Sequence, residues 1–205
     1  NNIQDVAQII DGHWLLDSTG VRSAFPYYDR VIAMGDNSWK DYEAMLTVTW
    51  NCLPVLNNKG GAPYQDHAHA SICLRWQGHD NDGRRPLRKW WPLGGLAGLT
   101  TRADSPDKMQ WYFWKGDGSR HLMGDSTRAM VVGRPYTYRV RVETLPDSKS
   151  RYSMKAWDAA SETEPHDWDM VVDENEQDLR SGTLLFVVHH GDVTFGNITV
   201  APIAD

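Results

Sequence analysis

The residues best suited to chemistry lie in one alternating stretch, residues 66–76. Its odd-numbered positions include two imidazoles, His67 and His69, and one guanidinium, Arg75, while its even-numbered positions from 68 onward are apolar. Because successive side chains of a strand point to opposite faces, this pattern predicts a half-buried β-strand with an open polar face. An imidazole exchanges protons near neutral pH, and a guanidinium pairs with carboxylates through two parallel hydrogen bonds.

A metal ion is a second interpretation of the same face. His67 and His69 would lie about 6.5–7 Å apart along a strand, and Cys73 would point to the same side. A metal site with His/His/Cys ligands is therefore an alternative. Gly61 followed by the two histidines is similar to part of a cupin metal motif, but the glutamate of that motif is missing. Two imidazoles alone supply too few ligands. We therefore predict no metal ligand here and no required cofactor; a structural calcium ion (Ca²⁺) bound elsewhere through backbone carbonyls stays open.

The other candidate residues lie on three further predicted strands and one polar loop. They are Glu43 and Asn51 on residues 42–51, Trp90 and Trp91 in loop 77–95, Arg139 and Arg141 on residues 136–144, and Lys155 and Trp157 on residues 151–157. We assign catalytic roles to His67, His69, Arg75 and Lys155, and substrate-binding roles to the rest. If their strands share a sheet, the cationic side chains form a positive groove suited to an acidic sugar. The tryptophans would then stack on sugar rings.

Two of these assignments also admit purely structural interpretations. Arg139 and Arg141 would pair with Glu143 and neighbouring acids if they lay on the convex outer sheet, and a sandwich has two solvated faces that sequence does not distinguish. Trp90 and Trp91 would be partly buried against their own loop. Both pairs of alternatives stay open.

The clearest early strand is residues 42–51, with apolar residues at every second position. A loop rich in Asn and Gly separates it from the histidine stretch, which favours a hairpin. In that hairpin Asn51 lies near His67 and Glu43 lies near Arg75.

Turn signals recur about every 8–12 residues along the whole chain, with almost no amphipathic helical pattern. This predicts an all-β fold, a two-sheet antiparallel β-sandwich (jelly roll) with a concave face. A chain of 205 residues suits one such domain, residues 1–205. Residues 158–181 are predicted as an acidic loop with room for a helical turn. Cys52 at a loop end and Cys73 in mid-strand are too far apart for a disulfide, so we predict two free thiols.

Net charge and composition limit the classes of molecule that this chain is expected to bind. The net charge of −6 argues against nucleic acid and anionic membranes, and no apolar run approaches the ~20 residues that span a bilayer, so no membrane insertion is expected. We expect a secreted or cell-envelope protein, either processed or one domain of a longer chain, that acts as a monomer. Ten Trp and eight Tyr against four Phe suit a wet recognition surface as well as a core.

Three stretches resemble the concanavalin A-like lectin/glucanase superfamily in its laminin-G-like branch. They are Trp39-Lys40-Asp41-Tyr42-Glu43 leading to Val48-Thr49-Trp50, then Tyr152-Ser153-Met154-Lys155-Ala156-Trp157, and finally Asp192-Val193-Thr194-Phe195-Gly196-Asn197-Ile198-Thr199-Val200. The resemblance implies a curved sandwich whose concave sheet meets carbohydrate. The Glu-x-Asp-x-x-Glu strand of the glucanases is absent. The stretch from Tyr152 to Ala156 is faintly similar to the Tyr-Phe-Lys-Ala strand of alginate-lyase-like members, but the other lyase motifs are not recognisable.

These observations favour a carbohydrate-recognising jelly roll for acidic or hydroxyl-rich sugars. The first alternative is a polysaccharide lyase, in which His67 or His69 removes the C5 proton of a uronic acid and Arg75 or Lys155 neutralises its carboxylate. A glycoside hydrolase is less favoured, because it needs two carboxylates and only Glu43 is an evident strand candidate. The last alternative is a laminin-G-like protein-binding module, which would show a flat apolar patch and no pocket.

Overall fold

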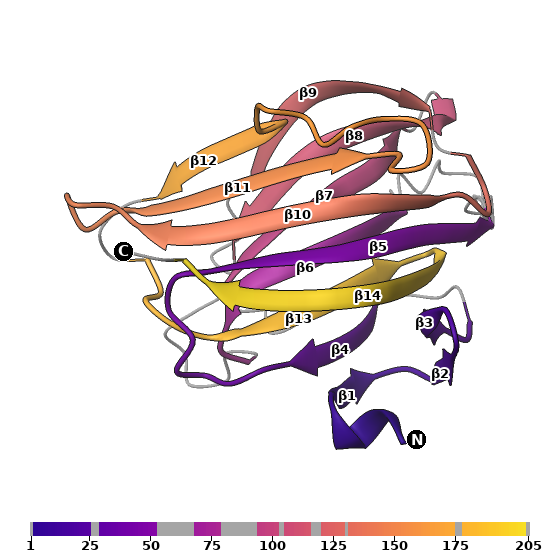
Figure 1. Cartoon of the computed structure of the whole chain (residues 1–205), viewed down its shortest axis with the longest axis horizontal. Coiled ribbons are helices and arrows are strands. Elements are labelled where there is room, and N and C mark those ends of the chain that lie inside the picture. Colours follow the sequence, from indigo (N-terminus) through magenta and orange to yellow (C-terminus); the bar gives the residue numbers. More distant parts are fainter. Residues whose placement is uncertain are drawn as a thin grey trace, which may run out of the picture.

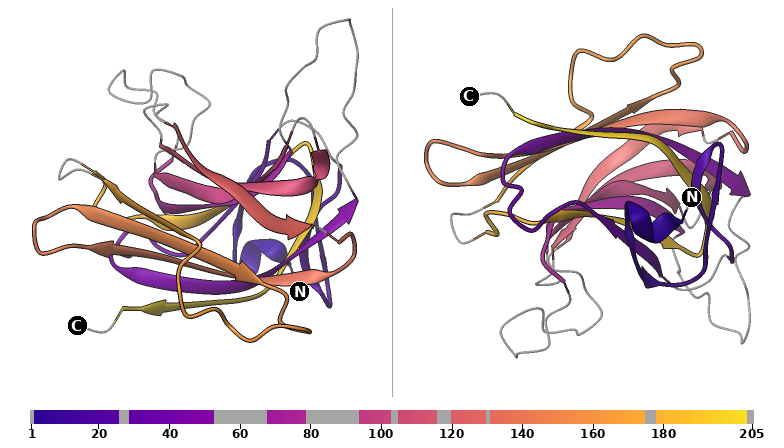
Figure 2. Two further views of the ribbon diagram at one scale, coloured as in Figure 1. Left: turned by 90° about the horizontal axis from the view of Figure 1, so that it is seen from above. Right: turned by 60° about the horizontal axis from the view of Figure 1, so that its bottom comes forward.

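The described strands of this protein form two seven-stranded sheets (Figure 1). The computed structural model describes residues 2–25, 29–52, 68–78, 94–102, 105–115, 120–129, 131–174 and 178–203. Figure 2 shows the two sheets as separate layers. Their recorded strand pairs are all antiparallel. The predicted two-sheet antiparallel sandwich is therefore confirmed.

The spatial order of the strands decides which side chains can meet. Sheet A contains β1 (Gln8–Asp11), β4 (Arg30–Met34), β13 (Thr183–His189), β6 (His69–Trp76), β7 (Gly95–Arg102), β8 (Ser105–Lys115) and β9 (Arg120–Ala129), in that order. Sheet B contains β12 (Met170–Glu174), β11 (Ser150–Trp157), β10 (Pro135–Thr144), β5 (Tyr42–Cys52), β14 (Asp192–Pro202), β3 (Gly20–Ser23) and β2 (Trp14–Asp17). A short 3₁₀ helix, η1 (Ile3–Asp5), precedes β1. No helix in the described ranges is long and apolar enough to span a membrane.

The main core lies between the two sheets. Every second residue of β5, from Tyr42 to Trp50, is at most 2% exposed, as its alternation predicted. Ala70, Ile72 and Leu74 of β6 belong to the same buried cluster and are fully buried. Burying each large aliphatic side chain contributes about 1.5–3 kcal/mol, so these two inward faces hold the layers together.

The predicted hairpin between residues 42–51 and the histidine stretch is wrong. β5 pairs with β10 and β14 in sheet B, whereas β6 pairs with β13 and β7 in sheet A. The two strands thus face each other across the core instead of sharing hydrogen bonds. The physical reason is that both strands carry an apolar face, and a long connection sets no pairing register.

A β-bulge at Arg75 reverses the predicted faces at the end of β6. Leu185 pairs with Cys73 but Thr183 pairs with Trp76, so β6 has one extra residue there. Arg75 is at this bulge, and its backbone φ is 53°. As a result Trp76 joins Cys73 in a second apolar cluster, on the opposite face of sheet A from the main core. The prediction that Arg75 lies on the open face and Trp76 on the core face is wrong, because the bulge shifts the alternation by one residue.

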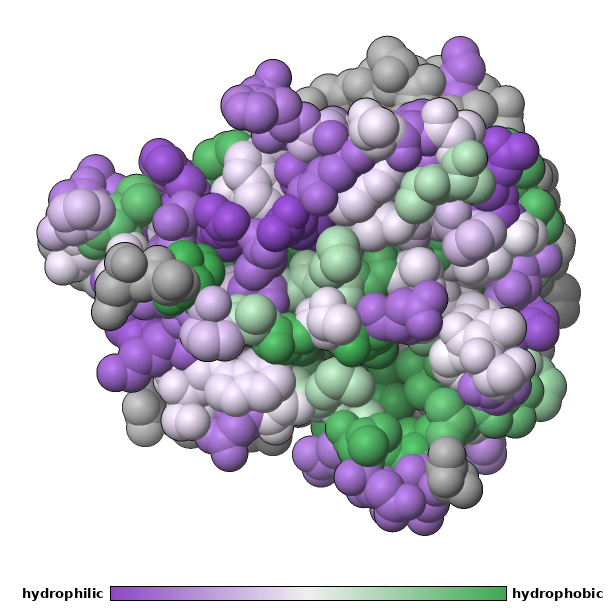
Figure 3. Space-filling model, viewed as in Figure 1, coloured by the Kyte–Doolittle hydropathy of each residue, from purple (hydrophilic) through white to green (hydrophobic). Residues whose placement is uncertain are grey.

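Residues 158–181 form more than the predicted acidic loop, because they include the edge strand β12, which pairs with β11. The predicted free thiols are confirmed for Cys52 and Cys73. Figure 3 shows apolar surface over the first strands of the chain and hydrophilic surface over β10 and β11. The exposed apolar side chains in residues 6–25 are Val6, Leu15, Leu16 and Phe25.

Candidate functional site

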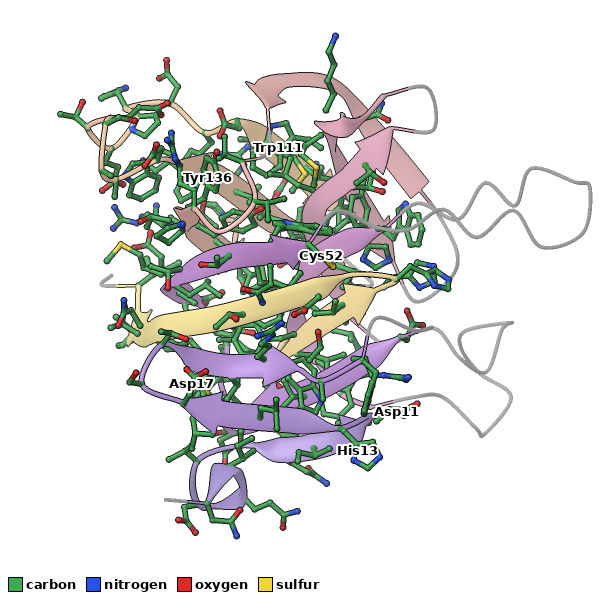
Figure 4. The ribbon with its side chains drawn as sticks, turned by 90° about the vertical axis from the view of Figure 1, so that its right-hand side faces the viewer. Asp11, His13, Asp17, Cys52, Trp111 and Tyr136 are labelled. Atoms are coloured by element: carbon green, nitrogen blue, oxygen red, sulfur yellow. The ribbon has the colours of Figure 1, made fainter. Side chains whose placement is uncertain are left out.

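Three neighbouring strands of sheet A place Asp29, His189 and His69 side by side. His189 at the end of β13 is the direct cross-strand partner of His69 at the start of β6. Asp29 precedes β4, whose first residue, Arg30, pairs with Val188. All three therefore lie at one end of the sandwich. Figure 4 looks at this end, with Cys52 labelled where β5 finishes.

Hydrogen bonding and stacking join these three side chains. His189 Nδ1 lies 2.7 Å from Asp29 Oδ1. The imidazole rings of His69 and His189 stack with their centroids 4.8 Å apart and their planes 12° apart. One potential ligand atom from each of the three residues lies within 4.8 Å of the other two. Two imidazoles on strands and a carboxylate that directly precedes a strand are thus held together.

A second pair of contacts orients His69 from its other side. His69 Nδ1 lies 2.8 Å from the Tyr112 hydroxyl and 2.7 Å from Ser71 Oγ, and these two hydroxyls also contact each other. Gly98 of β7 lies between Ser71 and Tyr112 in the sheet register. A Cβ atom at Gly98 would lie 2.8 Å from Ser71 Oγ and 2.5 Å from the Ala70 carbonyl oxygen. Glycine is needed at this position. We call Asp29, His69, Ser71, Tyr112 and His189 the histidine cluster.

The side chains of the histidine cluster differ in how far they are exposed to solvent. His69 is 3% exposed and Tyr112 is fully buried. The side chains of His189 and Asp29 are 14% and 24% exposed, so the cluster opens on this side. Trp114 is half-buried beside it, with its ring centroid 5.7 Å from that of His69 and 5.0 Å from that of Tyr112. A molecule at this surface would meet an indole face, an imidazole and a carboxylate.

Arg75 lies away from the histidine cluster, and its guanidinium hydrogen-bonds to groups of the fold. It is completely buried, and all five of its N–H donors have acceptors within the protein. The acceptors are the Lys40 carbonyl, Ser150 Oγ, the Leu179 carbonyl, Asp41 Oδ1 and Thr144 Oγ1, at 2.6–2.9 Å. Because Ser150 and Thr144 belong to sheet B, Arg75 ties the two sheets together.

The other predicted cations lie on the outer face of sheet B. Arg139 and Arg141 both donate to Glu43, which is 2.6 Å from Arg139 Nε and 2.7 Å from Arg141 Nη2. The positive groove was expected only if these strands shared a sheet, and the arginines and His69 lie on different sheets. The structural interpretation of the arginines is the one observed, although their acidic partner is Glu43 on β5.

Lys155 is held beneath the connection between β11 and β12. Its Nζ atom donates to the Pro165 carbonyl at 2.6 Å and pairs with Glu164 at 2.8 Å. It also lies 5.0 Å from the ring centroid of Trp168. Glu164 contacts Arg139 as well, so this ion-pair group fastens the connection to sheet B.

The remaining predicted site residues do not join the histidine cluster in the described ranges. Asn51 on sheet B donates to Asp192 Oδ1 at 2.9 Å and to Thr194 Oγ1 at 3.0 Å. Trp157 is only 5% exposed, which leaves little ring surface for a sugar. The predictions for His67, Trp90 and Trp91 fall outside the described residues.

Sequence reasoning found His69 but gave no site role to Asp29, Tyr112, Trp114 or His189. A signal existed for His189, since an open-face histidine ends an apolar strand. No comparable signal exists for Asp29 and Tyr112, because they reach the site only through the strand order of sheet A.

Comparison with known proteins gives matches in structure only. No protein-family model matches the chain, and no curated protein matches its sequence. The carbohydrate binding module CBM66 from Bacillus subtilis is 14% identical, with 95% of this chain and 94% of that one covered and a TM-score of 0.58. The exoplasmic/lumenal domain of VIP36 in its Ca²⁺/Man3GlcNAc-bound form is 12% identical, with 98% and 86% covered and a TM-score of 0.58.

An enzyme shares the same architecture. A mutant of the alginate lyase Aly36B, solved with an alginate trisaccharide, is 11% identical, with 93% of this chain and 85% of that one covered and a TM-score of 0.54. At such identities the likeness shows a shared fold and nothing more.

Proposed function

We propose that this chain, which has a concanavalin A-like jelly-roll fold, is a carbohydrate-recognising domain whose site is the histidine cluster with Trp114. The observation that carries the proposal is the row from Asp29 through His189 to His69, which is partly exposed at Asp29 and His189 and lies beside a half-buried indole. Imidazole and carboxylate groups exchange hydrogen bonds with sugar hydroxyls, and an indole face packs on the C–H surface of a pyranose ring. The carbohydrate binding module CBM66, and VIP36 in its Ca²⁺/Man3GlcNAc-bound form, support this use of the fold.

The arrangement of cations favours a hydroxyl-rich sugar over an acidic one. Arg139, Arg141 and Lys155 are paired with acids on the outer face of sheet B, and Arg75 is saturated between the sheets. None of these four is available beside the histidine cluster to neutralise a uronate. In this proposal the domain is secreted or part of the cell envelope and acts as a monomer on a poly- or oligosaccharide.

Retention on immobilised glycans, followed by titration with the retained oligosaccharide, tests the proposal. His189→Ala and Trp114→Ala should each weaken binding at least about tenfold, a loss near 1.4 kcal/mol. His166→Ala and Trp168→Ala are matched controls, because both residues belong to the connection on sheet B, and should leave binding unchanged. Equal affinities for all four variants would place the sugar site elsewhere.

A polysaccharide lyase is the second candidate function, and the contact between His69 Nδ1 and the Tyr112 hydroxyl favours it. A lyase needs a base that removes the C5 proton of a uronic acid and an acid that protonates the departing oxygen at C4. His69 could supply the base, oriented by Tyr112, but the Tyr112 hydroxyl is fully buried, so the acid would have to come from another residue. The predicted neutralisers, Arg75 and Lys155, are bonded elsewhere, so carboxylate neutralisation would need other residues.

The ultraviolet absorbance of the new carbon–carbon double bond separates the two functions. Incubation with a panel of polyuronates should leave this absorbance unchanged if the domain only binds. A rise that Tyr112→Phe abolishes would establish the lyase instead.

The grouped metal-ligand side chains among the described residues do not suit a calcium ion. VIP36 has been solved in Ca²⁺-bound and metal-free forms, which keeps calcium relevant to this fold. The grouped metal-ligand side chains described here are Asp29, His69 and His189. Calcium takes six to eight oxygen ligands, so a set with two imidazole nitrogens does not suit it. No step of the proposed recognition therefore depends on calcium.

A further inference from the structure

We propose that Asp29, His69 and His189 bind a divalent transition-metal ion, with zinc as its representative. The inference goes beyond the proposed function and does not depend on it, because it rests on these three side chains alone. Their ligand atoms already lie within 4.8 Å of one another. Zinc bonds of about 2.0–2.1 Å place tetrahedral ligand atoms about 3.3 Å apart, so the set must contract by about 1.5 Å at most.

The donor types select the class of ion. Two imidazoles with one carboxylate suit zinc, nickel, cobalt, copper or iron, whereas calcium and magnesium prefer oxygen alone. Three protein ligands also leave a fourth position for water or for a hydroxyl of a bound molecule. The side-chain exposures of 14% for His189 and 24% for Asp29 place that fourth position on the solvent side.

The contacts around His69 resemble the outer support of a metal site. Its Nδ1 atom is held by the Ser71 and Tyr112 hydroxyls, at 2.7 and 2.8 Å, which fixes the ring and assigns Nε2 to the ion. A metal-bound histidine typically uses its second ring nitrogen for such a hydrogen bond, which sets its tautomer and orientation.

Asp29 and His189 can turn to one ion together. Asp29 Oδ1 lies 2.7 Å from His189 Nδ1, so an ion that displaces the proton between them would meet both atoms. His69 Nε2 then becomes the remaining ligand. The three ligands come from, or directly flank, three adjacent hydrogen-bonded strands, so the site is largely pre-organised.

Calorimetric titration of chelator-stripped protein with Zn²⁺ tests this site, with the visible absorption of Co²⁺ as a second readout. We expect one ion per chain. His189→Ala and Asp29→Asn should each weaken binding at least tenfold and abolish the Co²⁺ spectrum. Both side chains are partly exposed, so these variants should fold, which circular dichroism would check. His166→Ala removes a fully exposed imidazole and is the control that should keep the wild-type affinity.

Absence of one-to-one binding, or equal affinity in His189→Ala, Asp29→Asn and His166→Ala, would overturn the site. Zinc binding is measured without sugar, so the two proposals fail separately. Loss of glycan retention with intact zinc binding overturns only the proposed function, and loss of zinc binding with intact retention overturns only the metal site.

Discussion

The imidazole rings of His69 and His189 stack 4.8 Å apart, although their strands are far apart in the sequence. They are direct cross-strand partners on the outer face of sheet A, and each ring is oriented by a different neighbour. Asp29 forms a hydrogen bond with His189, while the hydroxyls of Tyr112 and Ser71 contact His69. The pair is therefore positioned from both sides, and its surroundings can be tested one contact at a time.

Removing the Tyr112 hydroxyl should loosen His69 without removing the aromatic ring. Tyr112→Phe loses the 2.8 Å contact with His69 Nδ1 and the contact with Ser71. Because the hydroxyl is buried, we expect a loss of about 1 kcal/mol in the free energy of unfolding. Urea denaturation measures this value. A variant as stable as the wild-type protein would show that the contact does not hold His69 in place.

Gly98 should not tolerate a methyl group. In Gly98→Ala the new Cβ would lie 2.5 Å from the Ala70 carbonyl oxygen and 2.8 Å from Ser71 Oγ, and the backbone oxygen has little room to move. We expect destabilisation by about 1–3 kcal/mol, as for other overpacked sites. The same substitution should weaken glycan retention, because Ser71, which contacts His69, would be displaced. An unchanged denaturation midpoint would contradict the close packing of β6 and β7.

Arg75 should be among the most sensitive positions for stability. Arg75→Met leaves the Lys40 and Leu179 carbonyls and two hydroxyls without their donor, so we expect a loss of about 3 kcal/mol or more. Arg151→Met is the matched control, because Arg151 and its partner Asp173 are about 40% exposed. That surface pair should contribute less than about 1 kcal/mol. Similar denaturation midpoints for the two variants would refute the proposed difference.

The connection from β11 to β12 should loosen in acid. The pKa of Glu164 is lowered, mainly by its hydrogen bond with Lys155 and then by that with Arg139, with burial acting in the opposite direction. A lowered pKa means that the pair stabilises the fold above the ordinary value of 4.5 and loses this effect as pH falls through the folded value.

Glu164→Gln tests that linkage. The variant should be less stable than the wild-type protein at neutral pH, and the difference should shrink as pH falls toward about 3. Thermal unfolding of both proteins across this range gives the comparison. A difference that stays constant with pH would mean that the charge of Glu164 does not fasten the connection.

The two thiols should differ in reactivity. Cys73 is fully buried and burial raises its pKa, so it should react with a thiol reagent only after unfolding. Cys52 is partly exposed, and its pKa is raised by burial and by Asp192, so it should react slowly in the native protein and faster as pH rises. Cys52→Ser should abolish the native-state reaction. Native labelling of Cys73 would contradict the burial of the outer face of sheet A.

The sequence by itself determined the fold class and the inward faces of most strands. Alternation with a period of two is a local property, and it predicted the buried residues of β5 from Tyr42 to Trp50 correctly. It also predicted that Arg139, Arg141 and Lys155 share a face, because β10 and β11 form a simple hairpin in which Arg139 pairs with Lys155.

The tertiary structure decided which sheet each strand joins and therefore which side chains meet. Glu43 and Asn51 went to sheet B and His69 to sheet A, because the apolar faces of β5 and β6 pack against each other across the core. One extra residue at Arg75 turned its guanidinium inward, and no periodic pattern marks such a bulge in advance. Asp29, His189 and Tyr112 reached His69 through strand order, which depends on the packing of the whole chain rather than on any local stretch.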